Sequence, residues 1–126
     1  MIRYYTKSVP LTVAKALRDA GYNELCFYFY HEDLNAKSSK IGTFTNWNEE
    51  PGFISMPTYA EVLDWLSNKE VLIEEETTPR TNGATNFIVR NTMSEPLFAI
   101  CTDDWYKDFD TCIIKALEIL KNYEHF

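Results

Sequence analysis

The segment that most constrains the fold of this chain is "PTYAEVLDWLSNK", residues 57–69. Thr58 is followed three residues later by Glu61, the T-x-x-E spacing in which the two side chains accept hydrogen bonds from backbone N–H groups at a helix start. The apolar positions that recur at helical spacing are Tyr59, Val62, Leu63 and Leu66. The pattern predicts a helix with one buried stripe. It assigns Thr58 and Glu61 to capping rather than to an active site.

A second helix is predicted over Ser8–Ala20, where apolar residues recur at the same spacing. Ser8 is a residue type suited to the N-cap, and Pro10 is tolerated in a first turn. Gly21 follows the last periodic residue, and glycine often ends a helix because it accepts positive φ. We therefore expect Ser8 to cap this helix and Gly21 to end it.

The aromatic run "LCFYFY", residues 25–30, predicts a strand, since aromatic side chains favour a pleated surface. Alternation places Leu25, Phe27 and Phe29 on one face and Cys26, Tyr28 and Tyr30 on the other. We expect the Leu/Phe face to be core. The tyrosine face is expected at a half-exposed surface, where each hydroxyl can find a partner.

The segment from Glu32 to Gly52 is the least regular in the sequence. We expect a long loop that contains one short strand at "IGTFT" and a turn-rich connection at "NWNEEPG". Loops of this length are usually functional or mobile. With Trp47 near its end, this loop and the Tyr28/Tyr30 face are predicted to form an interaction surface for which Tyr4 and Tyr5 are further candidates.

The remaining residues predict three strands and a final helix. "EVLIEEET", "NFIVRN" and "LFAICT" favour a sheet, with Phe87 and Val89 on one side of the middle strand, and Asp108–Tyr123 has helical periodicity. The order is α-β-α-β-β-β-α. We predict an α+β fold in which an antiparallel sheet of three to four strands packs against the helices, joined by the aromatic strand. We expect a single domain over 1–126, with 56–126 as the α-β-β-β-α core and 1–55 as the N-terminal helix, strand and loop.

Charge and cysteine content bound the class of protein. The net charge is −7; residues 1–40 hold six basic and four acidic residues, whereas 41–126 hold six basic and fifteen acidic residues. Such an acidic body repels phosphate backbones, which makes nucleic acid an unlikely partner. The three cysteines have no CxxC spacing and the start "MIRYYTKSVP" lacks an apolar segment. We expect reduced thiols, a cytoplasmic location and no membrane association.

Few residues suggest catalysis or metal binding. His31 lies five residues after Cys26, so the two point to opposite faces of one strand and cannot form a nucleophile–base pair. The acidic cluster Asp103–Asp110 could attract a cation, but it lacks the spacing of a calcium loop, and Asp108 and Asp110 also suit a helix start. We predict no catalytic residue, no metal site and no cofactor. Whether the cluster binds a cation stays open.

Two stretches, "KALRDAGYNELCFYFY" and "FISMPTYAEVLDWLSNK", together resemble the paired signature of small uncharacterised proteins encoded by gut-bacterial genomes and their phages. In those proteins a helix ending in a G-aromatic-x-E step leads to a Cys- and aromatic-rich strand, and a P-T-x-x-E-V-x-D-W-L helix follows. The resemblance covers most of the chain. It implies a phage or mobile-element origin and transfers no catalytic residue.

Residues 56–126 are also similar in chain order to a double-stranded-RNA-binding domain, which would need basic residues at the start of its last helix. This chain offers Lys107 among several aspartates. Three functions remain. The first is a non-enzymatic protein-interaction or phage accessory factor, with Tyr28, Tyr30 and Trp47 as its surface and self-association included. The alternatives are a nucleic-acid-binding module and a small enzyme or metal-binding protein.

Overall fold

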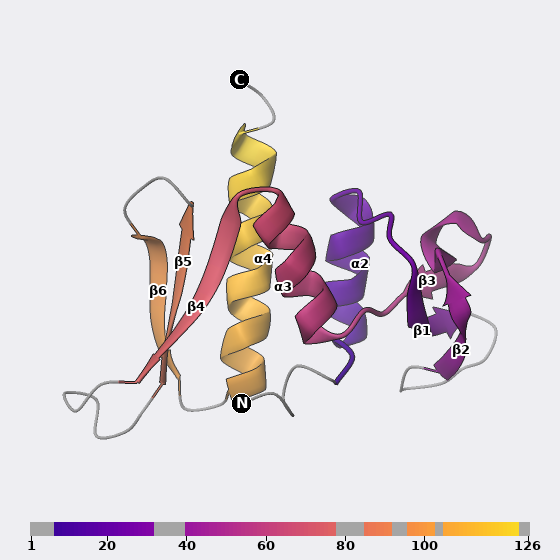
Figure 1. Ribbon diagram of the computed structural model, residues 1–126, viewed down its shortest axis with the longest axis horizontal. Coiled ribbons are helices and arrows are strands. Elements are labelled where there is room, and N and C mark those ends of the chain that lie inside the picture. Colours follow the sequence, from indigo (N-terminus) through magenta and orange to yellow (C-terminus); the bar gives the residue numbers. More distant parts are fainter. Residues whose placement is uncertain (1–6, 32–39, 78–84, 92–95, 103–104, 124–126) are drawn as a thin grey trace. The chain divides into compact units, whose positions relative to one another are not determined.

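A computed structural model describes residues 7–31, 40–77, 85–91, 96–102 and 105–123. Tyr4, Tyr5, Asp103 and Asp104 lie outside these residues. The described residues form an α+β fold with antiparallel sheets, which confirms the predicted class. In chain order (Figure 1) the elements are α2 (Leu11–Asp19), β1 (Cys26–His31), β2 (Lys40–Thr45), the 3-10 helix η2 (Trp47–Glu49), β3 (Phe53–Ser55), α3 (Tyr59–Asn68), β4 (Val71–Thr77), β5 (Thr85–Asn91), β6 (Pro96–Thr102) and α4 (Trp105–Tyr123).

The chain divides into two compact units, Met1–Val62 and Leu63–Phe126, with the division inside α3. Each unit holds its own three-stranded antiparallel sheet, in the order β2-β1-β3 and β4-β5-β6. The aromatic strand therefore does not join the C-terminal sheet as expected. It is the centre of a separate sheet because β2 and β3 pair with its two edges.

In the N-terminal unit, α2 packs on β3, and the segment before α2 is extended. Ser8 forms a β-bridge with Thr58, and the N–H of Val9 donates to the carbonyl of Pro57 over 2.9 Å. The predicted Ser8 cap is thus wrong: α2 begins at Leu11 after Pro10, without a side-chain cap. Gly21 does end the helix, at φ +94°. Its N–H donates to the carbonyl of Arg18 over 3.0 Å.

The two faces of β1 are reversed relative to the expectation. Cys26 is fully buried, whereas Leu25 and Phe27 are 49% and 48% exposed. Ile54, the register partner of Tyr30, is also buried, so the Cys26/Tyr28/Tyr30 face is the one that contributes to the core. Alternation with a period of two separates the faces but cannot say which one a helix covers, and here all six residues of the run are apolar or aromatic.

From residue 40 onward, the segment predicted as a long loop consists largely of regular secondary structure. Residues 40–45 form β2, one residue longer than the predicted strand, and residues 47–49 form η2. β3 at Phe53–Ser55 has no counterpart in the sequence-based prediction, because three residues are too few for a period to be recognised. Residues 32–39 of the predicted loop lie outside the described part of the chain.

In the C-terminal unit, α4 lies along β4, β5 and β6 (Figure 1). Phe87 and Val89 of β5 are fully buried, as expected, and the Phe87 ring meets Phe109 of α4 at a centroid distance of 5.1 Å. The helix begins at Trp105, one turn before the predicted Asp108. Asp108 consequently lies in its first turn, where a negative charge favours the N-terminal end of the helix dipole.

The capping box at α3 is confirmed. The N–H of Thr58 donates to Oε1 of Glu61 over 2.9 Å, and the N–H of Glu61 donates to Oγ1 of Thr58 over 3.2 Å. The buried residues of the stripe include Tyr59, Val62 and Leu66, as expected, while Leu63 is only half-buried. The helix ends at Asn68, and Glu70 beyond it has φ +67°.

Candidate functional site

One face of the N-terminal sheet carries two groups of aromatic side chains in ring contact, which together we call the aromatic face. Phe27, Phe29 and His31 alternate along the central strand and therefore point to the same side. Register places Phe53 of β3 opposite His31. The members of the aromatic face are Phe27, Phe29, His31, Phe44, Trp47 and Phe53.

Trp47 is the fixed centre of the aromatic face. Its ring centroid lies 4.4 Å from that of Phe29 and 5.1 Å from that of Phe53. Its indole N–H donates to the carbonyl oxygen of Cys26 over 2.9 Å. Gly42 permits this packing, since a Cβ added there would lie 2.9 Å from ring carbons of both Phe29 and Trp47. The indole is thus half-buried and held in one orientation, not carried on a free loop.

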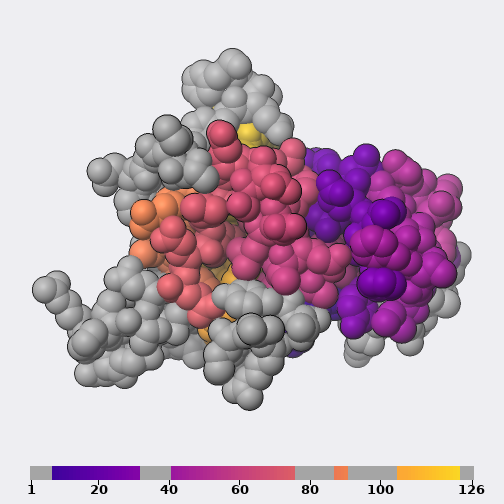
Figure 2. Space-filling model, in the orientation of Figure 1, coloured from indigo at the N-terminus to yellow at the C-terminus, as the bar shows by residue number. Residues whose placement is uncertain are grey.

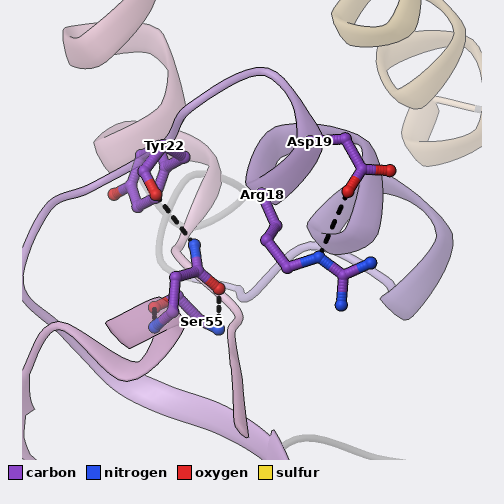
Figure 3. Close-up of polar contacts among 5 residues, drawn as sticks. Arg18, Asp19, Tyr22 and Ser55 are labelled. Atoms are coloured by element: carbon purple, nitrogen blue, oxygen red, sulfur yellow. Dashed lines mark hydrogen bonds and ion pairs between the residues drawn. The ribbon is translucent and has the colours of Figure 1, made fainter. Parts of the chain in front are cut away.

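Asn48 fastens the 3-10 helix to the rest of the unit. Its backbone N–H donates to Oγ of Ser55 over 3.1 Å, and the N–H of Ser55 donates back to its Oδ1 over 2.9 Å. Its Nδ2 donates to the carbonyl of Tyr22 over 2.9 Å (Figure 3). The amide of Asn46 also donates to the side chain of Asn23. These contacts join η2 to β3 and to the turn after α2, and no local sequence pattern signals them.

Four large apolar side chains are exposed among those whose burial the structure describes, and all four lie at positions 25–44. Besides Leu25 and Phe27, they are Ile41, which is 69% exposed, and Phe44, which is 50% exposed. Phe27 and Phe44 stack with centroids 4.8 Å apart at one end of the aromatic face. Ile41 is the register partner of Tyr28 and so lies on the opposite face. In Figure 2, residues 25–31 fall in the violet part of the colour bar and residues 41–44 in the magenta part.

The structure separates the three residues that the sequence suggested as one surface. Trp47 lies on the aromatic face, whereas Tyr28 and Tyr30 lie on the other face of β1 and are half-buried. Phe27 and Phe44, which the sequence analysis did not select, are more exposed than any of the three. They were missed because the Phe27 side was expected to be core. The two faces of β1 differ only in which one other elements of the fold cover, and that is a property of the tertiary structure.

Cys26 and Cys112 are buried thiols. Burial raises the pKa of Cys26, whose S–H donates to the carbonyl of Tyr28 over 3.2 Å. Burial, with a smaller contribution from the Asp108 carboxylate, raises the pKa of Cys112 to about 12. The ring of His31 packs edge-on to Phe53 at 4.3 Å, on the face opposite Cys26, as predicted. Neither thiol is placed for thiolate chemistry.

The acidic segment before and within α4 is described from Trp105 onward. The indole N–H of Trp105 donates to Oε2 of Glu75 on β4 over 3.1 Å. No group of three or more His, Cys, Asp or Glu side chains suited to a metal ion occurs among the described residues. Nor does any helix in that part of the chain combine the length and apolarity needed to cross a bilayer.

Three comparisons with known proteins return no relative: no family model, no curated protein and no solved structure matches this chain. The resemblance to phage and gut-bacterial proteins therefore stays a prediction. The aromatic face offers aromatic and aliphatic area with few ionisable groups, and aromatic residues are enriched at protein contact surfaces.

Proposed function

We propose that this chain is a non-enzymatic interaction protein that binds a protein partner through the outer part of its N-terminal sheet. The observation that carries the proposal is that, among the side chains that the structure describes, the four exposed large apolar ones all lie at positions 25–44. Single exposed apolar residues are common on proteins, but several gathered on two paired strands and the residue before them mark a contact site. Burying such side chains against a partner is favourable by about 25 cal/mol per Å² of apolar area.

The rigid attachment of the aromatic face to the rest of the unit supports the same function. Trp47 is fixed by its hydrogen bond to Cys26 and by contacts with two phenylalanine rings. Asn48 holds the 3-10 helix through three hydrogen bonds, two to Ser55 and one to Tyr22. A preformed surface loses little conformational entropy when it binds, so more of the contact energy contributes to affinity. The tyrosines of the initial hypothesis contribute from the other face, where Tyr28 adjoins the exposed Ile41.

The resemblance of two sequence stretches to small proteins of gut bacteria and their phages supports a role as a phage or mobile-element accessory factor in the bacterial cytoplasm. The double-stranded-RNA-binding alternative has the α3-β4-β5-β6-α4 order in its favour. Against it stand Glu74 and Glu75 on β4 and Asp108 in the first turn of α4, where phosphate contacts would need cations. Fold order alone does not carry function.

Affinity capture with substituted baits tests the proposal. Wild-type protein, the Phe27→Ser/Phe44→Ser variant and the control Thr12→Ala, exposed on α2 of the same unit, are used as baits on a lysate of the source organism. Partners identified by mass spectrometry are then purified, and their dissociation constants are measured for all three proteins. We expect the double variant alone to lose at least about tenfold in affinity. Equal affinity for all three baits would contradict the proposal.

A further inference from the structure

We draw no further inference here: the strongest candidate, the apolar edge of the N-terminal sheet along β2 with Phe44 exposed on one face and Ile41 on the other, carries no proposal because nothing in the part of the chain that the structure describes shows what covers it.

Discussion

The indole N–H of Trp47 donates a 2.9 Å hydrogen bond to the carbonyl oxygen of Cys26, a residue whose own side chain is fully buried. One strand residue thus connects the outer aromatic face with the interior of the N-terminal unit. Because of this bond and the ring contacts with Phe29 and Phe53, the most prominent aromatic residue of the predicted loop is part of the sheet's architecture. The free contact area belongs instead to its neighbours Phe27 and Phe44.

Gly42 should be intolerant of substitution. A Cβ at this position would meet ring carbons of Phe29 and Trp47 at 2.9 Å, and those rings are held against each other and against Phe53. Gly42→Ala is expected to lower the free energy of unfolding by about 1–3 kcal/mol, as overpacking does in cores. Urea denaturation followed by tryptophan fluorescence measures it. The neighbouring exposed Thr43→Ala serves as control, and equal midpoints for both variants would refute the packing described here.

Replacement of Glu70 by glycine should stabilise the protein. It follows the end of α3 with φ +67°, a left-handed conformation that costs energy for residues with a Cβ. Glu70→Gly is expected to raise the free energy of unfolding by roughly 0.5–1 kcal/mol. Glu70→Ala removes the same carboxylate but keeps the Cβ, so it should give no comparable gain. Thermal melts of both variants measure the change in stability. If Glu70→Ala raises the stability as much as Glu70→Gly does, backbone strain is excluded as the cause.

Some features of the fold follow from local sequence patterns, and others depend on contacts between elements that lie far apart in the chain. The Thr58–Glu61 box was predictable because both partners lie within one turn, and Phe87 and Val89 were placed correctly because the middle strand of a covered sheet alternates clearly. The sequence did not reveal which face of β1 is buried, since both faces of this strand carry apolar or aromatic residues. The Asn48–Ser55 pair spans seven positions without a recognisable motif. Contacts between elements decide such features, and single-sequence patterns do not encode them.

Stability should decline at alkaline pH through Cys112. Burial raises its pKa from 9.0, the value of an unperturbed thiol, to about 12 in the folded protein, so the folded state holds the proton more tightly than the unfolded state. The contribution of this group is complete below pH 9 and is lost as the pH rises toward 12. Cys112→Ala should therefore show a shallower fall of unfolding free energy over this range. Parallel slopes for the two proteins would contradict a protonated, desolvated thiol.

Double-stranded RNA should not bind at moderate salt. The chain carries a net charge of −7, β4 presents Glu74 and Glu75, and Lys107 is followed by Asp108 in the first turn of α4. A gel-shift titration with a duplex of about 16 base pairs, the span that such domains contact, tests this. Micromolar binding that weakens steeply with added salt would show phosphate contacts and restore the RNA-binding alternative.

The central claim is that Phe27 and Phe44 are exposed for binding and not for stability. The most direct measurement is a pair of numbers for Phe27→Ser/Phe44→Ser: its melting temperature and its dissociation constant for the captured partner. Both side chains are about half exposed, so we expect a melting temperature close to that of wild type, together with a dissociation constant raised by at least about tenfold. A large fall in melting temperature with partner affinity unchanged would show that the aromatic face serves the fold alone.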